Sequence, residues 1–438
     1  MSFFQELPRE LQLQVAGFCS LPTLASFSAT SKALNSLITP ILYRVVDLSS
    51  HNGPDIKTAI HSSKVPSDWP EHRCNPLDGI VYDKQRALIR TLRSHPSLGE
   101  YVRVLRWTTV DYPNYVEYEE VLPLYSQWNE RIISQRELDV SLEEYTFNDC
   151  TSRLWDTFST FTHVLDVDIA FMASGEREAC PPPPLFQHVQ SLRLSGMASS
   201  FLIRSILKSI HPTSLRHLHL GNLNQYAELE GVPEDLTIRE KGKMVPPFDR
   251  RYARNAGLMR AHLPECSSKW SNLQSLIIDT AGLSGPRLDT ISVMDAEILE
   301  AEDMRYQGLG TLIRSVAKTI YAFRFQQGPS NREYEDGWRI PRHVADGRPV
   351  PPQDGLRPMD DFFHRHILSA ILESSWPRLE KMELFGVASH TCYPNREAPS
   401  TNSPLSNETL SQIRAAVGPD PTLDIRPEAT RLFWITDL

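Results

Sequence analysis

Apolar residues along the chain recur in a six-residue spacing whose first, fourth and sixth positions are apolar and whose other positions are mostly polar. The seven copies are Val102/Leu105/Trp107, Val164/Val167/Ile169, Val189/Leu192/Leu194, Leu215/Leu218/Leu220, Leu273/Leu276/Ile278, Ile320/Phe323/Phe325 and Leu379/Met382/Leu384. The alternation over the last three positions is typical of a β-strand with one buried face. The pattern therefore predicts seven short strands.

Most copies follow a segment with helical periodicity. These segments are Asp83–Ser94, a run with Leu154 and Phe158, Phe201–Ile210, Leu309–Thr319 and Phe362–Ser374. A last helical segment, Asn407–Val417, leads to Leu423-Asp424-Ile425. A strand of this spacing paired with a helix is the unit of a leucine-rich repeat. We expect an α/β fold in which parallel strands stack side by side, with helices on the outer face of an open, curved solenoid. The alternative is an ordinary α/β domain with a parallel sheet.

The spacing between copies is irregular. Two intervals, of 25 and 26 residues, match the period of about 20–29 residues for leucine-rich repeats, and the other intervals are longer. We expect long insertions at residues 224–262 and 327–358. The whole repeat-like, substrate-binding domain is expected to span residues 82–438.

The N-terminal stretch from Leu7 to Leu48 predicts three short helices followed by a strand. Pro8 suits the first position of a helix, and Leu21-Pro22 and Pro40 are expected to interrupt the first and third helices. The apolar residues exceed what so small a unit can bury, which indicates a surface that docks a partner. The alternative is that Leu7, Leu11 and Leu24 pack the unit against the rest of the chain.

Several short motifs of this stretch occur in a characteristic order. They are LPREL at Leu7–Leu11, LPTL at Leu21–Leu24, Ser31-Lys32, Asn35 with Leu37, and PILYRVVDL at Pro40–Leu48. This ordered set resembles the F-box in the form common in fungal proteins. The sequence departs from that pattern at Gln12 and Gln14, which are polar, and at Phe18-Cys19, which replaces the usual tyrosine-leucine pair.

The resemblance implies a function and a set of contact residues. F-box domains bind the Skp adaptor, and through it cullin, in SCF (Skp–cullin–F-box) ubiquitin ligases, while the rest of the chain captures a protein substrate. Fungal F-box proteins often carry irregular leucine-rich repeats, which favours the solenoid over the ordinary α/β domain. We expect an F-box at 1–48, a connector at 49–81 and the repeat domain thereafter. The expected adaptor-binding residues are Leu7, Pro8, Leu11, Val15, Leu21, Leu24, Lys32, Leu37 and Leu42.

Composition and charge limit the classes of partner and the cellular compartment that we expect. The net charge is −9, which gives no general attraction to nucleic acid or to an anionic membrane. The sequence has no apolar run of transmembrane length and no secretory signal pattern. The six cysteines are far apart in sequence, which favours a reduced intracellular setting, cytoplasm or nucleus.

The expected insertion at 224–262 carries a basic cluster. It includes Arg239, Arg250, Arg251 and Arg254, with two further lysines and only two acidic residues between positions 239 and 254. Such a patch could bind an acidic segment of a substrate. The alternative is a solvated loop without a binding role.

The sequence lacks the common catalytic and nucleotide-binding motifs. His364 and His366 are two residues apart on an expected helix and do not share a face, and His390 and Cys392 lack a second ligand pair for zinc. His217 and His219 alternate with leucines and should face away from the core. We therefore expect no catalytic residues, no metal and no cofactor, and a protein that is not an enzyme.

Two alternatives to the ligase subunit stay open. The chain could bind the adaptor as a scaffold outside any ligase, or it could be an α/β enzyme whose active-site residues are dispersed in sequence. Co-purification of cullin would distinguish the scaffold from the ligase subunit, and a deep pocket with a polar cluster would favour the enzyme.

Overall fold

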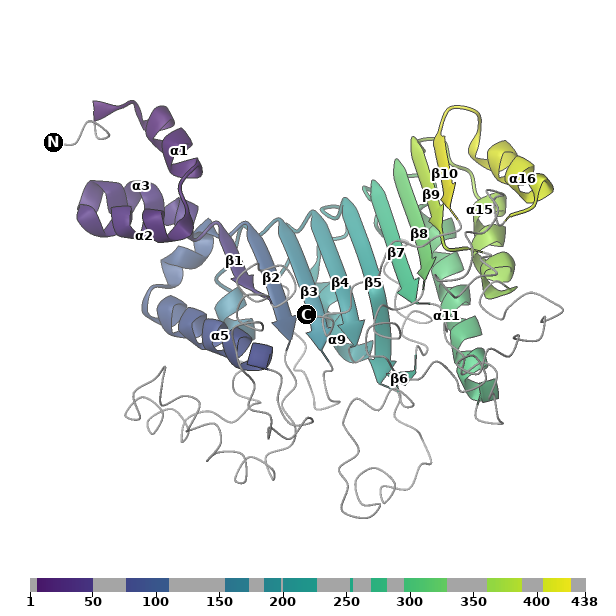
Figure 1. Cartoon of the computed structure of the whole chain (residues 1–438), viewed down its shortest axis with the longest axis horizontal. Coiled ribbons are helices and arrows are strands. Elements are labelled where there is room, and N and C mark those ends of the chain that lie inside the picture. Colours follow the sequence, from purple (N-terminus) through teal and green to yellow (C-terminus); the bar gives the residue numbers. More distant parts are fainter. Residues whose placement is uncertain are drawn as a thin grey trace, which may run out of the picture.

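The computed structural model describes residues 6–49, 76–109, 154–172, 185–197, 200–226, 253–254, 269–281, 295–328, 361–387 and 405–426. Within these residues a helical module at the N-terminal end is followed by a long sheet with helices along one face (Figure 1). The predicted α/β class is confirmed. Among the described residues no helix is long and apolar enough to cross a membrane.

The N-terminal module consists of α1 (Arg9–Gly17), α2 (Leu21–Thr30) and α3 (Lys32–Leu42). Serine side chains cap two of these helices, because Ser20 accepts a hydrogen bond from the Thr23 amide and Ser31 accepts one from the Leu34 amide. The module has a small core of its own. That core comprises Ala16, Leu24, Leu34, Leu37 and Ile38.

Two local predictions for the module are wrong in detail. Pro8 is the N-cap of α1 and not its first helical residue. Pro40 does not interrupt the third helix but lies inside α3. It occupies the last turn, where a missing N–H removes only one intrahelical hydrogen bond, and Tyr43 closes the helix by donating to the carbonyl of Thr39.

The sheet begins with the strand that ends the module. Its strands are β1 (Val45–Leu48), β2 (Val104–Thr109), β3 (Asp166–Met172), β4 (Ser191–Met197), β5 (His217–Tyr226), β7 (Ser275–Ala281), β8 (Ala322–Gly328), β9 (Lys381–Phe385) and β10 (Thr422–Arg426). These nine described strands are all parallel and are neighbours in chain order. A two-residue strand, β6 (Ala253–Arg254), pairs antiparallel with β5.

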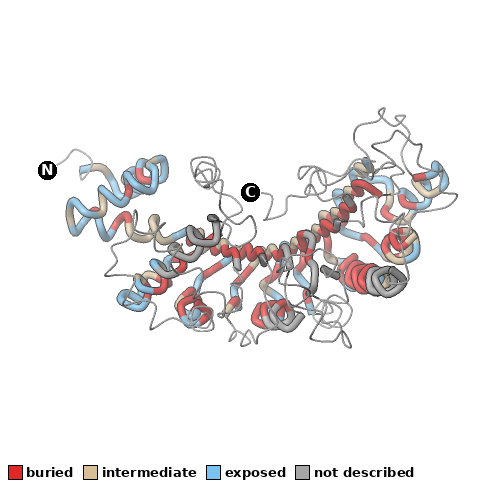
Figure 2. Tube along the Cα trace, turned by 60° about the horizontal axis from the view of Figure 1, so that its bottom comes forward, coloured by how far each residue is buried: buried red, intermediate tan, exposed pale blue. Residues whose placement is uncertain are grey.

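Helices cover one face of this sheet. They are α5 (Pro76–Ser94), the 3-10 helix η2 (Pro96–Tyr101), α9 (Ser200–Ser209), α11 (Asp295–Val316), the π-helix η7 (Phe363–Leu368), α15 (Ser369–Glu373) and α16 (Asn407–Val417). Figure 2 shows that the sheet is bent and that the helices lie on its convex side. The opposite, concave face is the one that the helices leave uncovered.

The seven sequence copies form the core between the sheet and the helices. The register aligns their fourth positions in one row, which runs Leu105, Val167, Leu192, Leu218, Leu276, Phe323 and Met382, and their sixth positions in the next. The residues of both rows are buried. The prediction of a strand at each copy is confirmed. Because apolar residues at alternate positions share one side of a strand, the same pattern also fixes which face meets the helices.

Several element boundaries differ from the predictions. Helix α5 starts at Pro76, inside the expected connector, and α11 starts at Asp295 and not at Leu309. The first turns of α11, from Asp295 to Glu302, carry mostly acidic and small residues. The first turns of α5 contain apolar residues, but they also contain Gly79, which disfavours a helix interior. The expected insertions also start too early, because β5 extends to Tyr226 and β8 to Gly328. Residues 329–358 lie outside the described residues.

One close contact between helices leads to a prediction about stability. A Cβ atom added at Gly310 of α11 would lie 2.6 Å from the backbone oxygen of His366 in η7. Gly310→Ala should therefore lower the free energy of unfolding by about 1–3 kcal/mol, because backbone must move to admit the methyl group. Chemical denaturation followed by circular dichroism measures the change.

Gly17 provides the matched control. No atom lies within 4 Å of a Cβ built at Gly17 in α1, so Gly17→Ala should be neutral or slightly stabilising. Equal stability of the Gly310→Ala variant and the parent chain would contradict the tight packing of α11 on η7.

Candidate functional site

The concave face of the sheet carries a continuous row of mostly charged side chains. Each residue of the row lies between the two buried apolar positions of its strand, so it points away from the helices. The register places these residues side by side across the sheet: Asp47, Arg106, Asp168, Arg193, His219, Ile277, Arg324, Glu383 and Asp424. We call this set the polar row.

Acidic and basic residues of the polar row alternate over the first four strands and form ion pairs between neighbours. The Arg106 guanidinium lies 3.7 Å from the Asp47 carboxylate, and the Arg193 guanidinium lies 3.4 Å from the Asp168 carboxylate. Neighbouring strands in a sheet are about 4.8 Å apart, which suits contacts of this kind. Over these four strands the row is thus neutralised by its own members, whereas Arg324, Glu383 and Asp424 pair with residues outside the row.

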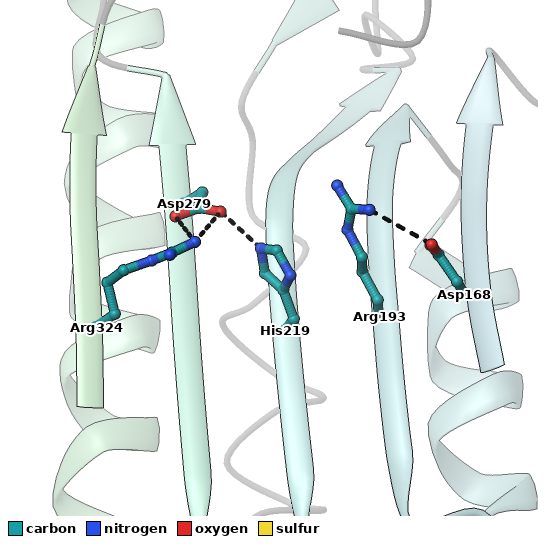
Figure 3. A network of polar contacts seen from close by, with 5 residues as sticks. All are labelled: Asp168, Arg193, His219, Asp279 and Arg324. Carbon is teal, nitrogen blue, oxygen red and sulfur yellow. Dashed lines mark hydrogen bonds and ion pairs between the residues drawn. The ribbon is translucent and has the colours of Figure 1, made fainter. Parts of the chain in front are cut away.

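Asp279 connects three strands just beyond the polar row, two residues after Ile277 on β7. Its carboxylate lies 2.6 Å from Nε2 of His219 on β5 and accepts hydrogen bonds of 3.1 and 3.2 Å from Arg324 on β8 (Figure 3). Gly221 pairs with Asp279 in the register and has no side chain to separate it from His219. This arrangement stabilises a carboxylate that is itself 9% exposed.

The surroundings of Asp279 act on its pKa in opposite directions. Burial alone would raise the pKa, but the hydrogen bonds and charges of His219 and Arg324 outweigh burial, and the net pKa lies below the ordinary value. The ionised carboxylate therefore stabilises the folded chain.

A shallow hollow of about 380 Å³ lies on the concave face over β2 to β7. Charged and polar side chains dominate its lining: Arg106, Asp166, Asp168, Ser191, Arg193, His217, His219 and Ser275. The pKa of Asp166 is raised by burial and by the nearby charge of Asp168, and Arg106, Ser191 and His217 oppose that rise only in part. The surroundings of Asp166 therefore disfavour the ionised form of its carboxyl group.

The residues predicted to bind an adaptor differ in how far the module buries them. Leu24 and Leu37 are buried in the module's own core, and Leu42 packs against that core. Any effect of Leu24 or Leu37 on a partner would therefore act through the fold of the module. Leu7 is partly buried. The others, Pro8, Leu11, Val15, Leu21 and Lys32, are exposed.

Most of the predicted basic cluster lies outside the residues that the structure describes. Arg239, Arg250 and Arg251 lie outside the described residues, as do His390 and Cys392. Arg254 belongs to β6, where it pairs with Gln225 of β5 in the register. Of the expected insertion at 224–262, its first three residues continue β5.

The described histidines lie in different parts of the fold. His217 and His219 face away from the leucines, as predicted, and both line the hollow. His366 is partly buried, and its Nε2 lies 2.7 Å from the carboxylate of Asp303 in α11. Among the described residues no group of three histidine, cysteine or acidic side chains is placed to hold a metal ion.

Sequence reasoning did not single out Arg106, Asp168, Arg193, Asp279 or Arg324. The signal was available, because all except Asp279 occupy the position between the two apolar residues of an L-x-L strand. No protein-family model matches the chain, and no curated protein matches it either.

The Asp279 cluster leads to a prediction about pH. Asp279→Asn should lower the free energy of unfolding at neutral pH by about 1–3 kcal/mol, because His219 and Arg324 lose a charged acceptor. The folded-state pKa of Asp279 is below its ordinary value. Its contribution is therefore complete above about pH 3.9 and is lost as the pH falls through the folded-state pKa. Urea denaturation of both chains between acidic and neutral pH measures this difference.

Asp424→Asn is the matched control for that experiment. Asp424 pairs with Arg426 at the end of the sheet, where the arginine side chain is exposed, so its loss should change the free energy of unfolding much less than the loss of Asp279. A stability difference between the Asp279→Asn chain and the parent that stays constant down to the lowest pH would contradict the assigned role of the carboxylate.

Proposed function

We propose that this chain is the substrate-recognition subunit of an SCF ubiquitin ligase. In this proposal the N-terminal module is an F-box that binds the Skp adaptor and through it cullin, and the sheet domain is an irregular leucine-rich-repeat-like solenoid that binds a protein substrate. The ligase subunit needs no catalytic residue, metal or cofactor of its own. Tethering raises the local concentration of substrate lysines near the ubiquitin-charged enzyme.

The observation that carries the proposal is the apolar surface of the N-terminal module. Phe18 at the end of α1 is 93% exposed, and Leu21 at the start of α2 is 63% exposed. Leu11 and Val15 are also exposed, and they lie one turn apart on α1. Exposed apolar side chains that adjoin one another are characteristic of surfaces that bind other proteins.

The way in which the module meets the sheet also supports a docking role. Contacts to the rest of the chain run from α3 to η2 and through β1 into the sheet. The alternative, in which Leu7, Leu11 and Leu24 pack the module onto the sheet domain, is disfavoured because Leu11 is exposed and Leu24 lies in the module's own core, while Leu7 is partly buried. A core inside the module leaves the outward side chains of α1 and α2 available to a partner.

The strand order supports the solenoid. In the described part of the chain, each parallel strand lies next to the parallel strand that precedes it in sequence, and helices lie along one face only. An ordinary doubly wound α/β domain has helices on both faces of its sheet. The curved, polar concave face is then the surface offered to a substrate.

Two other functions have weaker support. A scaffold that binds the adaptor outside a ligase would use the same module surface, and only the presence of cullin separates the two functions. An enzyme would need a set of groups arranged for catalysis in an enclosed pocket. The hollow on the concave face is shallow and open, and three of its charged or titratable groups, Arg106, Arg193 and His219, already pair with carboxylates. This favours a binding surface over an enclosed active site.

Adaptor binding is tested by removing the exposed apolar side chains together. We expect the parent chain to retain purified Skp adaptor in a pull-down. The variant carrying Leu11→Ala, Phe18→Ala and Leu21→Ala should bind the adaptor at least about tenfold more weakly, because each side chain buries apolar area worth about 1 kcal/mol or more. Adding cullin to the same experiment distinguishes a ligase subunit from a scaffold.

Leu165→Ala is the control, since Leu165 is also exposed but lies beside β3, in the sheet domain. It should leave adaptor binding unchanged. Failure of the parent chain to bind the adaptor, with its helices intact by circular dichroism, would refute the F-box assignment.

A further inference from the structure

We propose that the hollow on the concave face docks an acidic, Asp- and Glu-rich segment of a protein, with Arg106 and Arg193 as the residues that bind its carboxylates. This inference rests on the proposed function, because it names the chemical class of the segment that the substrate-recognition surface binds. The opposite assignment, a basic segment, is disfavoured by the way in which the charges are layered.

The cations of the concave face lie above the carboxylates with which they pair. The Arg193 side chain is 39% exposed and its partner Asp168 is 12% exposed, while the Arg324 side chain is 27% exposed above Asp279 at 9%. The pairs Arg106–Asp47, Lys381–Glu383 and Arg426–Asp424 have the same order of exposure. An approaching segment therefore meets guanidinium and ammonium groups first.

The arginines of the hollow have donors that their partners do not use. A guanidinium carries five N–H donors. Arg193 directs only Nη1 at Asp168, at 3.4 Å, and its side chain is 39% exposed, so the terminal nitrogens keep N–H donors for a ligand while Nε is buried. Arg106 approaches Asp47 no closer than 3.7 Å. Carboxylates of an incoming segment could accept these donors in the paired geometry that arginine favours.

Other groups in the hollow are suited to the same ligand. Ser191 and Ser275 line it with hydroxyl groups, and His217 and His219 add ring nitrogens. Asp166 is the group that opposes an acidic ligand, because Asp168 is already paired with Arg193. The hollow is open and shallow, which suits a surface segment of a protein better than an enclosed small molecule.

The test measures binding of a fluorescein-labelled oligoglutamate peptide to the full chain by fluorescence anisotropy. Arg193→Gln and Arg106→Gln should each weaken binding about threefold to tenfold, since each removes charge-assisted hydrogen bonds. Arg193→Lys keeps the charge and should recover part of the affinity. Raising the salt concentration should weaken binding to the parent chain, because exposed charges are screened.

Two further variants make the test specific for the hollow. Asp166→Asn removes the opposing carboxylate and should tighten binding of the oligoglutamate peptide. Arg90→Gln changes the charge equally but lies on α5, over the opposite face of the sheet, and should leave affinity unchanged. An oligolysine peptide of equal length should bind the parent chain more weakly than oligoglutamate does, because it meets the exposed Arg106 and Arg193 first.

The outcomes separate this inference from the proposed function. Oligoglutamate binding that is insensitive to Arg106, Arg193 and Asp166 overturns the inference, as does tighter binding of oligolysine in the hollow. A phosphoserine peptide that binds through the same arginines while oligoglutamate does not would also overturn it. Adaptor binding is measured separately, with the Leu11, Phe18 and Leu21 variant of the module. Failure of adaptor binding and failure of oligoglutamate binding in the hollow are therefore distinguishable.

Discussion

Burial of two rows of apolar side chains between the sheet and its helices holds every other feature of the molecule in place. The rows run across the parallel register from Leu105 to Leu423 and from Trp107 to Ile425, and most of their members are fully buried. Each such side chain contributes about 1.5–3 kcal/mol when removed from water. A shift of one residue in any strand would turn these residues to the concave face, so the register is strongly determined.

The same alternation produces the chemistry of the concave face. With the apolar residues facing the helices, the residue between them faces outward on every strand, and the strands place these outward residues next to one another. Asp279 is an example, because its carboxylate on β7 is stabilised by His219 from β5 and by Arg324 from β8. None of these three residues would be near the others without the sheet.

The sequence was informative where one residue type repeats at a fixed spacing. The seven apolar copies predicted the strands, their buried face and the outward direction of His217 and His219. It was less informative for the first turns of α5, which contain Gly79, and of α11, which carry mostly acidic and small residues. It was also less informative for Pro40, which the last turn of α3 tolerates. The cluster at Asp279 was not predicted because its contacts join residues 60 and 45 positions apart in sequence, and only the register shows which strands are neighbours.

The strand β1 has a consequence for the geometry of the whole molecule. It is the last element of the N-terminal module and the first strand of the sheet, pairing directly with β2. The module is therefore fixed to the sheet by a hydrogen-bonded ladder rather than by a tether. Neighbouring strands are about 4.8 Å apart. The strand order therefore fixes the distance between the module and the strands that form the hollow, β2 to β7. Adding or removing one strand would change that separation by one step and leave both surfaces intact.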